Sequence, residues 1–160
     1  MKHVAIGAVL WLALAGAAPA EPSDSELAAP IHAFIDAFNK GDGKTAATTH
    51  TGDVAIIDEA PPYVWRGAGA FAAWAADLAA NDAKAKITDQ SVTIGEPTRT
   101  EVAGDRAYVI VPAVYAYKQA GAPMHEPAQM TFALVKTEGG WKIAGWTWTG
   151  PKPTAGAGKP

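Results

Sequence analysis

The chain has 160 residues, of which 49% are apolar and 18% are charged, and its formal net charge is −3. This composition is sufficient for a buried core and excludes an intrinsically disordered protein. The 13 Lys and Arg residues form no basic block, so nucleic-acid binding is not expected. Because the chain has no cysteine, disulfides, thiolate catalysis and cysteine-ligated metals are excluded.

Residues 1–20 have the pattern of an export signal. Lys2 precedes an apolar run over Val4–Ala18, and a small-x-small cleavage motif ends at Ala20. The run is shorter than the roughly 20 residues of a membrane-spanning helix. We therefore predict a signal peptide that is cleaved after Ala20, and a periplasmic or secreted protein with no stable membrane span after cleavage. An uncleaved membrane anchor is the alternative.

Two helices are predicted at the start of the mature chain. Ser23 and Glu26 fit a capping box, the apolar residues that follow have helical spacing, and Gly41 is a natural stop. Asp42 can cap a short second helix over Gly43–Thr49.

A short apolar strand over Val54–Ile57 ends before Pro61 and Pro62, and a third helix follows over about Ala68–Ala80. Beyond this helix the apolar residues recur with a period of two, which indicates strands. Four further strands are predicted, over Ala85–Glu96, Ala107–Lys118, Pro127–Lys136 and Trp141–Thr149.

Helices followed by antiparallel hairpins predict an α+β fold, with the helices packed on one face of a curved sheet. Both faces of the strand over Ala107–Lys118 are apolar, so Pro112 in its middle requires a bulge or an edge position. Residues 151–160 contain no large apolar side chain and are predicted to form a disordered tail. The remainder, residues 21–150, is predicted to be one domain.

Four segments carry a family resemblance: Phe34–Asp42, Ile57–Asp58, Trp65–Gly67 and Gly140–Ile143. They resemble fold markers of the NTF2-like superfamily, in its SnoaL-like and ketosteroid-isomerase-like branch. The resemblance covers about Glu26–Thr149 and implies a cystatin-like cone in which three N-terminal helices pack on a curved mixed or antiparallel sheet. With its leader, the chain resembles an exported bacterial member. This fold hosts enzymes, binding proteins and assembly modules, so it does not by itself give the function.

Asp58 is the candidate general base. It lies where an apolar strand passes into a proline-rich loop, and burial there would raise the pKa of its carboxyl. In ketosteroid isomerase, which the spacing of this region resembles, the aspartate at this place shuttles the proton. The tyrosine that stabilises the enolate there aligns with Phe34 here, so steroid isomerisation is not supported. An Asx-turn role for Asp58 is the alternative.

Aromatic side chains are the candidate ligand-binding set, because small-molecule pockets are mostly apolar with a few polar groups. Trp146 and Trp148 share one face of the last strand, and symmetric pairing about the final turn predicts Gln129 opposite Trp148. Ordinary packing in the core or in a dimer interface is the alternative role of the tryptophans. The predicted pocket is lined by Trp65, Trp74, Tyr115, Gln129, Trp146 and Trp148.

His50 is the candidate partner of Asp58, since both are expected near one end of the cone; capping or surface exposure is the alternative. No pair of histidines has the spacing of a metal-binding motif, so neither a metal site nor a cofactor is predicted. None of the three arginines lies in the middle of a strand, which argues against the Asp–Arg–Asp chemistry of limonene epoxide hydrolase.

Three functions therefore compete. The first is an exported domain that binds a small apolar or aromatic molecule in a cone-shaped pocket. The second is a lyase, isomerase or cyclase that uses Asp58 as its general base. The third is a dimeric protein-interaction module of the cell envelope. We expect a homodimer, because many NTF2-like proteins pair through their sheets.

Overall fold

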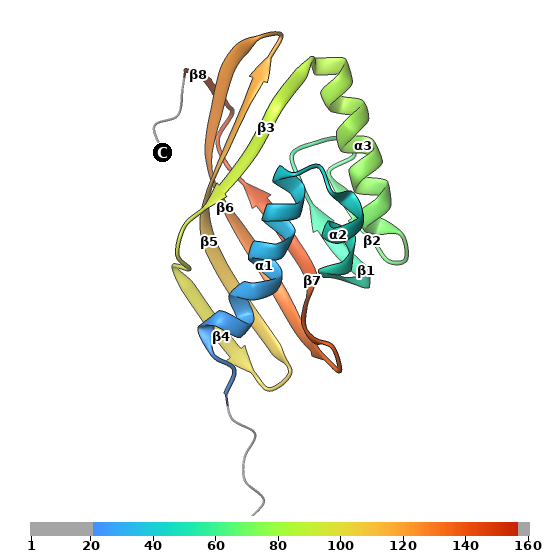
Figure 1. Ribbon diagram of the computed structural model, residues 1–160, viewed down its shortest axis with the longest axis vertical. Helices are drawn as coiled ribbons and strands as arrows, with labels where there is room; N and C mark the ends of the chain where they lie inside the picture. The colour runs from blue at the N-terminus through green and yellow to red at the C-terminus, as the bar shows by residue number, and fades with distance from the viewer. Residues whose placement is uncertain (1–20, 157–160) are drawn as a thin grey trace, which may run out of the picture.

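The computed structural model describes residues 21–156. Figure 1 shows the helices on one side of a strongly curved sheet, whose long strands extend over most of the length of the molecule. The predicted signal peptide and the last four residues of the predicted tail lie outside the described residues.

The two N-terminal helices begin and end close to the residues that the sequence predicts. Helix α1 spans Asp24–Asn39, and the capping box between Ser23 and Glu26 is present at its start. Helix α2 spans Gly43–Thr48, and the side chain of Asp42 accepts a hydrogen bond from the backbone N–H of Thr45. Local side-chain caps thus specify both starts.

Helix α3 spans Ala70–Ala85 and follows the first two strands. An α+β fold with a curved mixed sheet is therefore confirmed, although only α1 and α2 precede the first strand. Within the described residues the strands are β1 (His50–Ile57), β2 (Val64–Arg66), β3 (Ile87–Ile94), β4 (Arg99–Ala103), β5 (Arg106–Gln119), β6 (Ala122–Thr137), β7 (Gly140–Thr149) and β8 (Thr154–Ala155).

The strands are ordered β2-β1-β7-β6-β5-β3 across the sheet, with β4 also pairing with β5 and β8 with β6. Strand β1 runs parallel to β7, whereas the other pairs are antiparallel. The parallel pair places the end of β1 beside Trp146 and Thr147, and so beside the aromatic part of β7.

A bulge in β7 changes the predicted register of the final hairpin. From Thr137 to Leu134 the pairing is symmetric about the turn, but Leu134 faces Ile143 while Ala133 faces Gly145, so Ala144 is an extra residue. The prediction of Gln129 opposite Trp148 is wrong for this reason. Met130 faces Trp148 and Phe132 faces Trp146. The bulge therefore places apolar residues against both tryptophans.

Pro112 occupies neither a bulge nor an edge strand, contrary to the sequence prediction. It lies in β5, where β4 pairs up to Ile110 and β3 pairs from Ala113 onward. The missing N–H of proline thus falls in the gap between these two neighbouring strands. The Pro112 carbonyl accepts a hydrogen bond from the N–H of Gly95 in the same gap.

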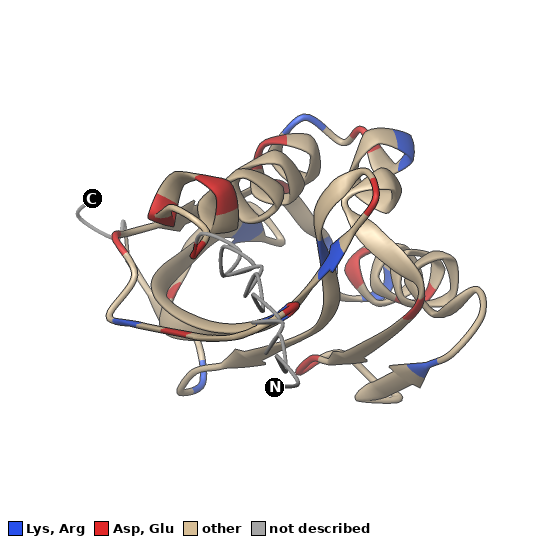
Figure 2. Ribbon diagram, turned by 90° about the horizontal axis from the view of Figure 1, so that it is seen from below, with Lys and Arg blue, Asp and Glu red and all other residues tan. Residues whose placement is uncertain are grey.

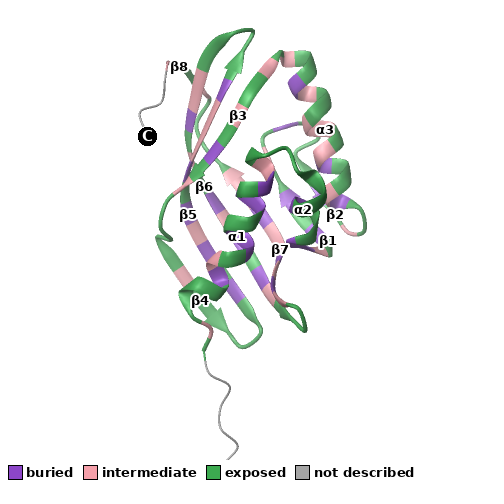
Figure 3. Cartoon of the chain, viewed as in Figure 1, coloured by how far each residue is buried: buried purple, intermediate pink, exposed green. Residues whose placement is uncertain are grey.

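The hydrophobic core lies between the helices and the concave face of the sheet. Its most deeply buried side chains include Phe34, Ile56, Phe132 and Ile143, each exposed by 2% or less. Figure 3 shows buried and more exposed segments alternating along the strands, as expected for a sheet with one covered face. Burial of these apolar side chains holds the helices on the sheet in a chain that has no cysteine.

The predicted disordered tail is partly ordered. Thr154 and Ala155 form β8 and pair with His125 and Met124 of β6. Composition alone missed this strand because backbone hydrogen bonds to an existing sheet edge, rather than apolar side chains, order the segment.

We predict that Gly145→Ala lowers the free energy of unfolding. A Cβ at this position would lie 3.0 Å from the backbone oxygen of Ala55, across the parallel β1–β7 pair. A close contact of this kind typically costs about 1–3 kcal/mol, measurable by urea denaturation. Gly52→Ala is the control, since a Cβ there meets no atom within 4 Å. Equal stability of both variants would contradict the close approach.

Candidate functional site

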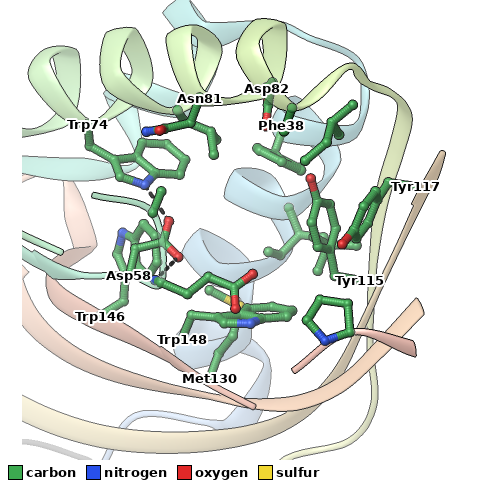
Figure 4. Close-up of a pocket in the computed structure, with 18 of the residues that line it drawn as sticks. Phe38, Asp58, Trp74, Asn81, Asp82, Tyr115, Tyr117, Met130, Trp146 and Trp148 are labelled. Carbon is green, nitrogen blue, oxygen red and sulfur yellow. Dashed lines mark hydrogen bonds between the residues drawn. The ribbon is translucent and has the colours of Figure 1, made fainter. Parts of the chain in front are cut away.

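A cavity of about 550 Å³ lies between the helices and the concave face of the sheet. Figure 4 shows Trp74 and Asp58 on one side of it, and Tyr115 and Tyr117 on the other. Most of its surface is aromatic or aliphatic, and a few carboxyl groups interrupt it. The aromatic part of the lining comprises Phe34, Phe38, Trp74, Tyr115, Tyr117, Trp146 and Trp148.

Asp58 follows the last residue of β1 and lines the cavity. Alternation along the strand explains its direction, because Ile56 is fully buried and Ile57 is 45% exposed. The loop that follows closes on itself through a hydrogen bond from the Asp58 N–H to the carbonyl of Tyr63.

Two donors hold the Asp58 carboxyl group. The indole Nε1 of Trp74 donates to Oδ2 at 2.6 Å, and the backbone N–H of Glu59 donates to Oδ1 at 2.7 Å. Burial raises the pKa of Asp58, and these hydrogen bonds partly oppose the shift. The Asp58 carboxyl is therefore oriented, partly dehydrated and a stronger base than an exposed aspartate.

Glu59 also lines the cavity, so both carboxyl groups after β1 contribute to it. Packing around the Glu59 carboxyl, and then the nearby carboxyl groups of Glu126 and Asp58, raise the pKa of Glu59 to about 8. Glu59 is at the same time exposed to solvent.

On the far side of the cavity a chain of hydrogen bonds joins β5 to α3. The hydroxyl of Tyr115 donates to Oε1 of Gln90, and Nε2 of Gln90 donates to Oδ2 of Asp82 at 2.7 Å. Burial raises the pKa of both Tyr115 and Asp82. Tyr115, Asp82 and Asp58 thus bring polar groups to the cavity from three different elements.

Glu126 of β6 is fully buried on the covered face, opposite Tyr115. The indole Nε1 of Trp148 donates to its Oε1 at 2.8 Å, while its Oε2 has no hydrogen-bond partner among the described residues. Gly150 lies against this carboxyl group: a Cβ there would come within 2.1 Å of Oε1. Sequence reasoning missed Glu126 because nothing in its own strand marks a buried acid.

The structure brings together five of the eight residues that the sequence singled out. Besides Asp58, the cavity is lined by Trp74, Tyr115, Trp146 and Trp148.

Trp65, Gln129 and His50 lie elsewhere, outside the lining of this cavity. Trp65 is buried and its indole donates to Asp77 of α3 at 2.8 Å. Gln129 is exposed, on the opposite face of β6 from the buried Met130.

His50 is buried at the start of β1, between the rings of Phe34 and Phe71. Its Nδ1 lies 2.9 Å from the carbonyl oxygen of Ala46, so a proton on Nδ1 completes a hydrogen bond. Burial lowers the pKa of His50 to about 4. In this position the imidazole is a neutral part of the core.

Residues 21–156 contain no group of three potential metal ligands close enough to hold an ion. No helix in the same range is long and apolar enough to cross a bilayer.

A family model for the SnoaL-like domain matches residues 27–147, which include both faces of the cavity. The chain belongs to the SnoaL-like domain family. The predicted NTF2-like and ketosteroid-isomerase-like relationship is therefore confirmed. No curated protein matches the chain.

Solved structures with the same fold differ widely in what their names describe. A ketosteroid isomerase-like protein from Erwinia carotovora atroseptica is 22% identical, with a TM-score of 0.63 over 82% of this chain and 100% of its own. A hexachlorocyclohexane dehydrochlorinase (LinA, type 2) is 19% identical, with a TM-score of 0.66 over 86% of this chain and 95% of its own. The CaMKII hub of S. rosetta is 19% identical, with a TM-score of 0.64 over 84% of this chain and 100% of its own.

At these identities the likeness of this SnoaL-like domain to solved structures shows the fold alone. The function must therefore be inferred from the side chains of this chain. One of them is Phe34, which lines the cavity without a hydroxyl group at the place where the resemblance to ketosteroid isomerase expects one.

We predict that His50 makes the domain less stable in acid. Its pKa is about 4 in the folded protein and near 6.5 when unfolded, so the unfolded chain binds more protons between these values. The free energy of unfolding should fall by on the order of 2–3 kcal/mol as pH drops from 6.5 to 4. His50→Phe should remove this part of the pH dependence, even where its absolute stability differs.

The comparison uses urea denaturation at several pH values. His32→Gln is the control, since His32 is exposed on α1. An unchanged slope in His50→Phe would contradict a neutral, buried imidazole.

Proposed function

We propose that the domain binds a small, mostly apolar or aromatic molecule in its cavity. The observation that carries this proposal is the aromatic lining, with rings from α1, α3, β5 and β7 around one space of about 550 Å³. This volume falls in the range of ordinary small-molecule sites, about 300–1,000 Å³. The polar groups of Asp58, Tyr115 and Asp82 would orient the ligand.

We predict that Ala85→Trp blocks this binding. Ala85 is half-buried at the end of α3 and lines the cavity, so an indole there would fill part of the space. The uncharged dye N-phenyl-1-naphthylamine is the probe, because its fluorescence rises in apolar surroundings.

The affinity of Ala85→Trp for the dye should be at least tenfold weaker than that of the native protein, a loss of about 1.4 kcal/mol. Ala83→Trp is the control, since Ala83 is exposed on the same helix and does not line the cavity. The proposed site would be contradicted if the native protein did not raise the fluorescence of the dye, or if both variants bound the dye equally well.

Proton abstraction by Asp58 is the second candidate function, consistent with lyase, isomerase or cyclase chemistry. It is favoured by the hydrogen bond from Trp74, which fixes one oxygen of a half-buried carboxyl group that faces an apolar space. A carboxylate in such surroundings has a raised pKa and is a stronger base toward a carbon acid.

We predict that the protein accelerates ring opening of 5-nitrobenzisoxazole, a probe for buried bases. The Asp58 carboxylate would take the proton on C3 while the N–O bond breaks, giving a single product, a phenolate that carries a nitrile group. Asp58→Asn should lower the rate by about 100-fold or more, the usual contribution of a general base.

Asp53→Asn is the control in this assay, since Asp53 is an exposed carboxylate on the same strand. If Asp58→Asn retains the native rate, Asp58 is not a general base. The proposal that the cavity binds a ligand would still stand. Product formation is followed by phenolate absorbance.

Export and self-association complete the proposal. The leader pattern over residues 1–20 supports action in the periplasm or outside the cell. We also propose that the protein forms a homodimer. A dimeric protein-interaction module of the cell envelope is the remaining alternative to ligand binding and catalysis. Tyr108 of β5 is exposed on the face of the sheet away from the core, where such a contact would form.

A further inference from the structure

We infer that the ligand of this cavity carries a positive charge, as an aromatic quaternary ammonium ion. This inference rests on the proposed ligand-binding function and names the chemical class of the ligand. It depends on three observations: an excess of carboxyl groups in the lining, aromatic rings in the same cavity, and a buried acid next to these rings.

The cavity has more acids than bases. Asp58, Glu59 and Asp82 line it, whereas Lys84 is the one cationic residue of the described lining. Lys84, in the last turn of α3, and Glu59 are both exposed, so water screens their charges, whereas Asp58 is half-buried and Asp82 is buried. Figure 2 shows acidic and basic residues interspersed along the ribbon of the molecule.

Three aromatic rings line the same cavity. The ring centres of Tyr115 and Tyr117 are 4.6 Å apart, and Trp148 stands edge-on to Tyr115 at 6.1 Å. Figure 4 shows Tyr115 and Tyr117 on the side of the cavity away from Trp74, and Trp148 at the bottom of the view. The negative potential of a ring face attracts a cation within about 6 Å, most strongly where the cation has lost water.

A buried acid stands behind this aromatic group. Glu126 is fully buried, accepts the indole N–H of Trp148 and leaves Oε2 without a hydrogen bond within the described part of the chain. It also lies close enough to Glu59 to raise the pKa of that residue. Carboxyl groups packed this closely repel one another when ionised, and a cation between them would relieve the repulsion.

A quaternary ammonium ion suits this lining better than a primary amine. It has no N–H group, so its transfer from water leaves no donor unsatisfied against aromatic rings. Its charge is spread over methyl groups that can contact Tyr115, Tyr117 and Trp148 directly. A phenyl group attached to it would occupy the apolar remainder of the cavity, beside Phe34 and Trp146.

The test compares phenyltrimethylammonium with tert-butylbenzene, an uncharged molecule of the same shape. Binding of each is followed by tryptophan fluorescence at pH 9 and low salt, where the carboxyl group of Glu59 is ionised and the ammonium ion keeps its charge. We expect the cation to bind at least tenfold more tightly than its neutral counterpart. Glu59→Gln and Asp82→Asn should each reduce this preference severalfold while the affinity for tert-butylbenzene stays within twofold.

Glu101→Gln is the matched control, because Glu101 is an exposed carboxylate on β4 and lies outside the cavity lining. If tert-butylbenzene binds as tightly as the cation, the charged ligand class is excluded and the apolar site stands. If neither molecule binds up to its solubility limit, this inference and the proposed function both fail. A preference for the cation that Glu59→Gln and Asp82→Asn leave unchanged would also overturn the inference.

Discussion

The hydrogen bond from Trp74 to Asp58 links α3 to the end of β1 in the wall of the cavity. Without that donor, a carboxyl group at the end of β1 would lie among apolar atoms with only the Glu59 N–H to compensate lost water. The same bond fixes the Trp74 ring, which contacts Phe34, Phe71 and Trp146 edge-on or tilted. One polar contact thus positions both the candidate base and much of the aromatic wall.

The sheet contributes the other half of the site through a shift of one residue. The extra residue Ala144 in β7 places Trp146 and Trp148 opposite Phe132 and Met130, so that the covered face stays apolar. Beyond the bulge, Trp148 reaches Glu126 of the neighbouring strand. A wall that is otherwise apolar therefore contains a buried acid beside the rings of Trp148 and Tyr115, and the cavity combines aromatic surface with negative charge.

Much of this arrangement could be predicted from local patterns. Ser23 and Asp42 mark two helix starts by their capping chemistry, and the strand-to-loop transition marks Asp58. The β7 bulge could not be predicted, because the hairpin turn fixes the register only up to Ile143 and tertiary packing decides the rest. Glu126 and Asp82 were missed because their burial results from neighbours distant in sequence. His50 was placed wrongly in space for the same reason: its ring packs on Phe34 and Phe71.

The proposed function requires a ligand to enter the space between Trp74 and Trp148. The most direct measurement is a ¹H–¹⁵N spectrum of the indole N–H groups, recorded during titration with an aromatic ligand. We expect the signals of Trp74, Trp146 and Trp148 to shift, since these rings line the cavity. The signals of Trp65 and Trp141 should stay in place. Shifts confined to Trp65 or Trp141, or equal shifts of all five, would contradict it.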